Sequence, residues 1–217
     1  MPHPADIVLI AGSPSPSSRS AAALEYIAHA LHQEHQDTHT LFARDLVATA
    51  LSVSNPSEHP AIQSAAVVVQ NARAVVVATP VYNAAYSGVL KTFLDLLPQK
   101  ILTGKVVFPV ATGGSLAHLL AIEYALKPVL SALGARHILQ GVYLTDAQIT
   151  WVAGTKTAYS TVFRIEESEE NRLFEGVTTL LHSVYGSMIA TRPGAVSVGK
   201  DLALPATGDH EKGTINE

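Results

Sequence analysis

Residues 7–20 read IVLIAGSPSPSSRS, and this stretch indicates the fold of the whole chain. Its first five residues, Ile7 to Ala11, are apolar and predict a strand that is covered on both faces of a sheet. A loop of glycine, serine and proline follows, and then Arg19 and a stretch with helical spacing. Backbone N–H groups at a helix start carry partial positive charge, and hydroxyls and a guanidinium add donors. The stretch therefore predicts a strand, a phosphate-binding loop and a helix.

The loop differs from two common nucleotide-binding motifs. It lacks G-x-x-x-x-G-K-[ST], the loop of nucleoside-triphosphate enzymes, and G-x-G-x-x-G, the dinucleotide motif. A serine-rich loop with one arginine suits a terminal phosphate monoester. An ordinary polar turn that caps a helix would use the same residues, because serine is a favoured N-cap. The loop alone leaves both interpretations open.

Composition indicates a globular protein of one domain. The chain has 217 residues, of which 47% are hydrophobic, and a formal net charge of −4. Such a charge favours neither a nucleic acid nor an anionic membrane as partner. There are no cysteines, which excludes disulfides and cysteine-ligated metals. We recognise no signal peptide and no apolar run of membrane-spanning length, and so expect a cytoplasmic protein.

Short β-rich runs alternate with longer helical stretches. We expect strands at 7–11, 38–43, 74–79, 105–112 and 137–143, and helices at 20–33, 60–72, 87–97, 116–133 and 167–184. This alternation predicts an α/β fold of three layers, with a doubly wound, five-stranded parallel sheet in the flavodoxin-like order 2-1-3-4-5. We expect residues 1–188 to form this domain and residues 189–217 to be a poorly ordered C-terminal extension.

Two further loops follow strands whose carboxyl ends meet the first loop. In such sheets ligands bind at that edge, near the switch point between the first and third strands. After the third strand, Pro80, Val81, Tyr82 and Asn83 predict a tight turn whose backbone can face a flat ring. After the fourth, residues 112–115 read TGGS, and two glycines allow a backbone to approach a ligand closely. Each loop alone could be a simple connection, but three at these strand ends favour a shared ligand site.

Longer motifs in the same loops resemble those of a known family. Residues 80–83 (PVYN) and 87–91 (SGVLK) are similar to the NADPH-dependent FMN reductases. Four longer motifs are similar, more narrowly, to the FMN reductases of alkanesulfonate monooxygenase systems. They are residues 85–92 (AYSGVLKT), 94–98 (LDLLP), 111–120 (ATGGSLAHLL) and 124–130 (YALKPVL). The resemblance extends over residues 7–149, and residues from Thr150 onward depart from the family pattern.

The resemblance implies a cofactor site at these three loops. It implies that the FMN phosphate is held by Ser13, Ser18, Arg19 and Ser20. It implies that the isoalloxazine ring and ribityl chain are lined by Pro80, Val81, Tyr82 and Asn83. It implies that the pyrimidine side of the ring is covered by Thr112, Gly113, Gly114 and Ser115.

The resemblance also implies the reaction and the partners. NADPH or NADH would reduce FMN, and the reduced flavin would leave for a separate flavin-dependent monooxygenase of the sulfonate type, within sulfur metabolism. The family favours a homodimer or homotetramer. Leu94, Leu96 and Leu97 agree with this, because they make more of the helix surface apolar than packing against one sheet requires. Because the cofactors carry the hydride chemistry, we assign no catalytic side chain.

Pro128 predicts an irregularity inside the helix expected at 116–133. Proline removes a helical hydrogen bond and crowds the carbonyl of the residue four positions earlier, here Tyr124. A wide π-type turn around Tyr124 would absorb the conflict. The resembling reductases have a tyrosine in such a helix at a subunit interface. We therefore hypothesise that Tyr124 assists flavin exchange; the alternative is a buried interface tyrosine above a simple proline kink.

Other functions fit the sequence less well. A reductase that keeps FMN bound and reduces quinones, azo dyes or metals is one alternative. A non-enzymatic flavodoxin-like electron carrier is another, although such carriers usually bear strong acidic charge for docking. The histidines at 29, 32, 35 and 39 have no carboxylate or cysteine to complete a metal site, so we expect no metal.

Overall fold

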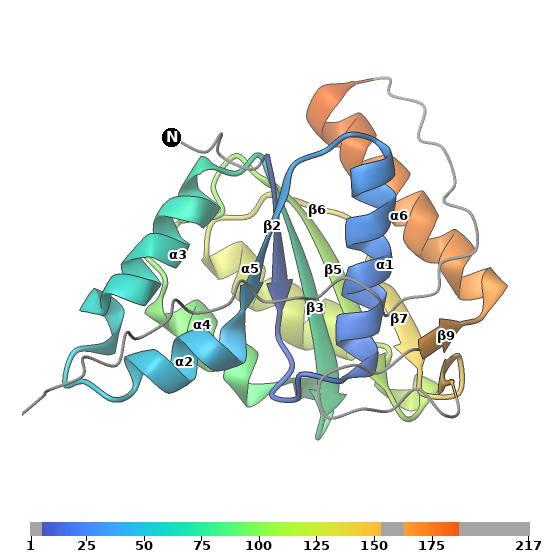
Figure 1. Ribbon diagram of the computed structural model, residues 1–217, viewed down its shortest axis with the longest axis horizontal. Coiled ribbons are helices and arrows are strands. Elements are labelled where there is room, and N and C mark those ends of the chain that lie inside the picture. Colours follow the sequence, from blue (N-terminus) through green and yellow to red (C-terminus); the bar gives the residue numbers. More distant parts are fainter. Residues whose placement is uncertain (1–5, 153–162, 187–217) are drawn as a thin grey trace, which may run out of the picture.

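The structure is a computed structural model, and it describes residues 6–152 and 163–186. A seven-stranded sheet runs through its centre, with helices on both faces (Figure 1). The parallel strands are β1 (Ile7–Ala11), β2 (Thr38–Phe42), β3 (Ala74–Tyr82), β5 (Val106–Gly113), β6 (His137–Ile138) and β7 (Val142–Thr145). They lie in the order β2-β1-β3-β5, with both β6 and β7 paired to β5. A short strand, β4 (Ala85–Tyr86), pairs antiparallel to the end of β3.

The helices divide between the two faces of the sheet. One face is covered by α1 (Arg19–Gln33) and α6 (Glu167–Tyr185), and the other by α2 (Ala43–Ala50), α3 (Pro60–Asn71), α4 (Gly88–Leu96) and α5 (Lys127–Ala132) (Figure 1). Because side chains alternate along a strand, Ile7 and Leu9 pack with the first pair of helices, and Val8 and Ile10 pack with the second group. Every residue of β1 is buried, which explains its continuous apolar sequence.

The sheet has seven strands in place of the five that we expected. One addition is β4; the other arises because the strand expected at 137–143 divides into β6 and β7. The register shows the cause: Val107 pairs with Ile138, and Val110 pairs with Val142. Three steps along β5 thus match four along its partner, so the partner carries an extra residue and bulges away. A second, two-stranded sheet joins β8 (Ile149–Trp151) and β9 (Phe163–Ile165), which the sequence did not indicate.

The expectation of one continuous helix over 116–133 was wrong. The segment consists of a 3₁₀ turn (Leu116–His118), a π-helix (Ile122–Leu126) and α5. Pro128 lies in the first turn of α5, where a missing N–H costs no helical bond. The π-type turn that we predicted around Tyr124 is confirmed. Gly134 follows α5 with a φ of +97°, which ends the helix.

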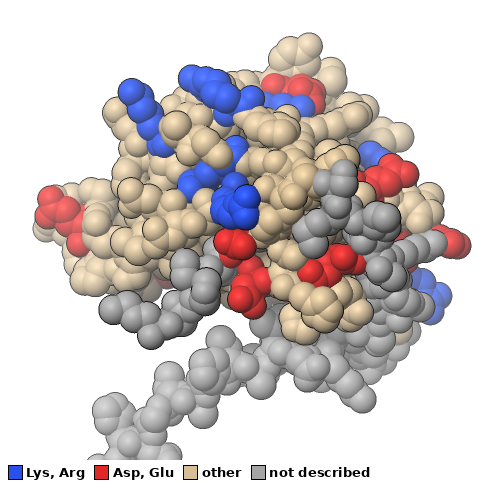
Figure 2. Space-filling model, turned by 90° about the horizontal axis from the view of Figure 1, so that it is seen from above, with Lys and Arg blue, Asp and Glu red and all other residues tan. Residues whose placement is uncertain are grey.

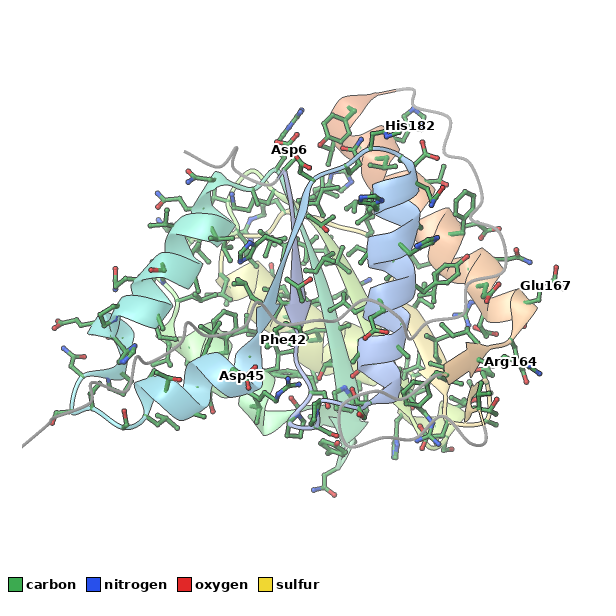
Figure 3. All side chains as sticks on the ribbon, in the orientation of Figure 1. Asp6, Phe42, Asp45, Arg164, Glu167 and His182 are labelled. Atoms are coloured by element: carbon green, nitrogen blue, oxygen red, sulfur yellow. The ribbon has the colours of Figure 1, made fainter. Side chains whose placement is uncertain are left out.

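The amino ends of the strands lie at the opposite edge from the loops of interest. There Asp6 and the last turns of α6, marked by His182, lie at the same end of the molecule (Figure 3). The Tyr185 hydroxyl donates to Asp6 Oδ2 at 2.9 Å, and the Arg73 guanidinium lies 4.6 Å from the centre of the Tyr185 ring. Figure 2 looks onto this edge, where basic side chains gather beside acidic ones. The two contacts of Tyr185, with Asp6 and with Arg73, tie α6 to the start of the sheet.

The expected extension at 189–217 lies outside the described residues. No helix within residues 6–152 and 163–186 is long and apolar enough to cross a membrane.

Candidate functional site

The loops after β1 and β3 are joined directly at the carboxyl edge. The Gly12 N–H donates to the Ala78 carbonyl at 2.7 Å, and the Ser87 hydroxyl donates to the Gly12 carbonyl. A side chain at position 12 would lie 3.0 Å from both the Ala78 carbonyl and the Leu90 side chain. The close approach of the two loops therefore favours glycine at position 12.

The predicted phosphate loop leads into α1 as expected. Ser18 is the N-cap of this helix, and its hydroxyl accepts from the Ala21 N–H at 3.1 Å. The Ser20 hydroxyl lies 3.2 Å from that of Ser18, and the Ser13 hydroxyl accepts from the Ser15 N–H at 3.1 Å. Ser13 and Ser20 are buried, whereas Ser18 and Arg19 are partly exposed. Ser18, Arg19 and Ser20 thus lie at the positive end of the helix dipole, and Ser13 lies in the loop that precedes it.

Arg19 is held by the loop that follows β7. Its Nε donates to the Ile149 carbonyl at 3.0 Å, and its Nη1 lies 3.4 Å from Asp146 Oδ2. The Asp146 N–H donates to the Gly113 carbonyl at 2.9 Å, which joins Arg19 to the glycine loop after β5. Sequence reasoning missed Asp146 and Ile149. The signal was available for Asp146, which follows the fifth strand at the same edge of the sheet.

The loop after β3 is a tight hairpin that leads into β4. Val81 pairs with Tyr86 and Tyr82 with Ala85, so the turn consists of Asn83 and Ala84. These two residues have φ values of +48° and +64°, as in two-residue hairpin turns. Pro80 and Val81 are buried, and Tyr82 is 52% exposed at the tip. We predicted a tight turn over residues 80–83; the structure instead extends β3 to Tyr82 and forms the turn one step later, and Tyr82 stands partly free of the core.

The loop after β5 presents bare backbone. A side chain at Gly113 would overlap the Tyr143 hydroxyl, which itself donates to the Ser115 carbonyl at 2.8 Å. At Gly114 an added Cβ would meet only Asp146 Oδ2, 4.0 Å away. The backbone at Gly114 is therefore open to a ligand, while Gly113 is packed tightly behind it. The side chain of Thr112 is buried.

Tyr143 retains its proton at neutral pH. Burial raises the pKa of the Tyr143 hydroxyl, and the nearby charge of Asp146 raises this pKa further. Since a protonated hydroxyl can donate, the bond to the Ser115 carbonyl persists across the physiological range. Tyr143 thus holds the glycine loop in one position.

The π-helix and the segment that leads into it carry an exposed apolar surface. Tyr124 is 79% exposed, and Leu116, Leu119 and Leu120 are also exposed. The structure corrects our reasoning about the leucines at the end of α4. Leu94 and Leu97 are buried within the chain's own core and Leu96 packs against it, so these leucines indicate no contact with a second subunit.

Within the described part of the chain, no group of three or more His, Cys, Asp and Glu residues could hold a metal ion. The candidate site instead offers backbone N–H groups, hydroxyls, one guanidinium and a glycine loop. Phosphate and a flat, hydrogen-bonding ring suit this set of donors.

Comparison with known proteins gives the same family that the motifs resemble. The profile of the family described as NADPH-dependent FMN reductase matches residues 5–149. An FMN reductase (NADPH) of Pseudomonas putida strain KT2440 is 41% identical over 89% of this chain and 92% of its own length. The apo crystal structure of the NADH:FMN oxidoreductase EmoB aligns with a TM-score of 0.70 and 34% identity, over 87% of this chain and 94% of its own.

A flavodoxin from Streptococcus pneumonia TIGR4 aligns with a TM-score of 0.54 and 16% identity, over 82% of this chain and 99% of its own. That likeness is one of fold alone. The chain therefore has a flavodoxin-like α/β fold with a mostly parallel sheet.

Proposed function

Because this chain belongs to the NADPH-dependent FMN reductase family, we propose that it reduces free FMN and releases the product to a separate flavin-dependent monooxygenase. The chain is an oxidoreductase that uses FMN and a reduced nicotinamide. Relatives named for NADPH and for NADH both align with it, so either nicotinamide is a candidate donor. A sulfonate-type monooxygenase in sulfur metabolism remains our proposal for the partner, on the motifs at 85–98 and 111–130.

We assign the FMN phosphate to Ser13, Ser18, Arg19 and Ser20, as the sequence suggested. The residues fit this group, because the partly exposed Arg19 lies at the amino end of the 15-residue helix α1. The observation that carries the assignment is the continuity of the site. Arg19 contacts Asp146, and Asp146 is bonded to Gly113 of the neighbouring loop.

We assign the ring to the two remaining loops. Pro80, Val81, Tyr82 and Asn83 form one side, and Thr112, Gly113, Gly114 and Ser115 form the other. The open backbone at Gly114 supports this, because a ring edge can approach it without a side chain between. When bound there, FMN supplies the hydride chemistry.

The residues of the chain act by holding and shaping this site. Ser87 fixes the loop after β1 to α4 through the Gly12 carbonyl, and Tyr143 fixes the glycine loop. Backbone N–H groups near the pyrimidine side would favour negative charge on the ring. No side chain of the site is required to move a proton, so we assign none as the catalyst.

We also propose that Tyr124 assists flavin exchange and that copies of the chain associate as a homodimer or homotetramer. The exposed apolar surface of Leu116, Leu119, Leu120 and Tyr124 supports the association, because such surfaces in water commonly mark contacts between proteins. The π-helix supports the role of Tyr124, since these irregular turns are frequent at functional sites.

Residues 1–188 would form the reductase domain, with a core order of 2-1-3-4-5 and a C-terminal extension at 189–217. The buried side of α6, which includes Leu173, Val177 and Leu180, supports placing this helix inside the domain. The use of a reduced nicotinamide supports the cytoplasmic location.

The proposal is tested by measuring NADPH and NADH oxidation with and without added FMN. We expect oxidation to depend on added FMN, and the protein to purify largely colourless. A yellow protein that oxidises the nicotinamide without added FMN and reduces quinones would instead be an FMN-bound reductase. The substitution Arg19→Met should weaken binding of FMN but not of riboflavin, which lacks the phosphate. Equal effects on both flavins would place the phosphate elsewhere.

A further inference from the structure

A carboxylate lies within the cradle that we assign to the phosphate. Asp146 Oδ2 is 3.4 Å from Arg19 Nη1, and it is also the atom nearest to the open position above Gly114. The side chains of both Asp146 and Arg19 are accessible, with exposed fractions of 44% and 29%. The carboxylate thus lies beside both the proposed phosphate site and the proposed ring site.

We propose that Asp146 keeps FMN exchangeable by opposing its phosphate. This inference rests on the proposed function. Arg19 supplies the positive charge of the cradle, and the Asp146 carboxylate offsets that charge before any ligand arrives. A phosphate monoester carries about −1.5 to −2 charges at neutral pH, so it is repelled by Asp146 as well as attracted by Arg19. The net attraction is then small, as suits a flavin that must leave after each turnover.

Arg19 has a second anchor besides Asp146. The guanidinium keeps a separate hydrogen bond from Nε to the Ile149 carbonyl at 3.0 Å. The Asp146 backbone N–H, which donates to the Gly113 carbonyl, is also unaffected by a change of its side chain. Partly exposed ion pairs contribute little to folding stability, so removal of the carboxylate should act mainly on the ligand.

The test compares the affinities of Asp146→Asn and the parent protein for FMN and for riboflavin, by fluorescence titration. The substitution removes one negative charge and keeps the size of the side chain. We expect the Kd for FMN to fall on the order of tenfold. The reason is that the repulsion between a carboxylate and a phosphate a few ångströms apart is strong at a partly buried site, and the variant lacks it. We expect slower FMN release and an unchanged Kd for riboflavin. Added salt should weaken FMN binding to the variant more than to the parent, because the variant's cradle carries a net positive charge.

Asp95→Asn is the matched control. Asp95 forms an exposed ion pair with Lys91 at 2.6 Å near the far end of α4, so this variant loses the same charge away from the cradle. It should leave both flavin affinities unchanged. A similar gain in FMN affinity in the control would attribute the effect to overall charge and overturn the inference.

Other outcomes also decide the matter. Weaker FMN binding by Asp146→Asn would show that Asp146 positions Arg19 and does not oppose the phosphate. Equal changes for FMN and riboflavin would show that Asp146 acts through the glycine loop. Either result would overturn the proposed role of Asp146 but not the proposed phosphate site, because the parent protein would still bind FMN. If the parent binds no FMN, or binds FMN and riboflavin equally and Arg19→Met changes neither affinity, the proposed phosphate site fails as well.

Discussion

The hydroxyl of Tyr143 donates a hydrogen bond to the carbonyl of Ser115 at 2.8 Å, and this bond fastens β7 to the loop after β5. The same hydroxyl occupies the space that a side chain at Gly113 would need. One phenol group therefore sets both the position of the loop and the residue that the loop can accept. The proposed ring site adjoins this contact, because the backbone at the neighbouring Gly114 is open.

Tyr143→Phe should loosen the glycine loop without unfolding the protein. The loss of one partly buried hydrogen bond is expected to lower the free energy of unfolding by about 1 kcal/mol. FMN affinity should fall roughly threefold to tenfold, since the loop must then be ordered by the ligand. Urea unfolding and fluorescence titration measure the two effects. Unchanged FMN affinity in the variant would show that the loop is positioned by other contacts.

Alanine at the two neighbouring glycines should have opposite effects. Gly113→Ala forces a methyl group against the Tyr143 hydroxyl and should destabilise the fold by about 1–3 kcal/mol. Gly114→Ala adds its methyl group to open space, so stability should change little while FMN affinity falls. Thermal unfolding and FMN titration of both variants test this. A Gly114→Ala variant with full affinity would remove the ring from this position.

Deletion of Tyr124 should slow the exchange of FMN. The π turn of Ile122–Leu126 contains one residue more than an α-helical turn, and the deletion allows regular α-helical bonding. We expect tighter retention of FMN and slower dissociation. Tyr124→Ala is the control, because it removes the side chain and keeps the extra residue. Flavin exchange at the parent rate after the deletion would contradict the proposed role.

Tyr185 should make the fold sensitive to alkaline pH. Burial and the hydrogen bond to Asp6 raise the pKa of Tyr185 to about 12, from an ordinary value of 10.0. Between these two pH values the unfolded chain releases the proton and the folded chain keeps it, so stability falls as pH rises. Tyr185→Phe removes this contribution.

Urea unfolding at about pH 9 and about pH 11 measures the difference. The loss of stability between the two should be smaller in Tyr185→Phe than in the parent. Tyr124→Phe, at an exposed tyrosine, should behave as the parent does. Equal losses in all three proteins would mean that Tyr185 does not contribute.

The sequence predicted those parts of the fold that are determined by interactions between residues close in the chain. The apolar run of Ile7–Ala11, the serine cap of α1 and the π turn at Tyr124 all follow from residues close in sequence. The short helix α2 gave no such signal, because its N-cap, Phe42, has no side-chain capping bond. The bulge between β6 and β7 depends on register against β5, which no pattern within residues 137–143 records.

The same distinction holds at the candidate site. The three loops were recognisable because each directly follows a strand whose carboxyl end lies at one edge. The contacts that join them were not. Arg19 and Ile149 are 130 positions apart, and their hydrogen bond exists only once α1 and the segment after β7 have packed together. The pairing of Arg19 with Asp146 depends on the same packing.

The bond between Asp6 and Tyr185 spans 179 sequence positions and lies at the edge remote from the proposed flavin site. The beginning and end of the described core are therefore spatial neighbours. A circular permutant that links Gly186 back to Asp6 through a short flexible connector would preserve the sheet, and the exposed turn at Ser52 to Asn55 offers a place to open the chain. A reporter domain attached at the new ends would then leave the three site loops uninterrupted.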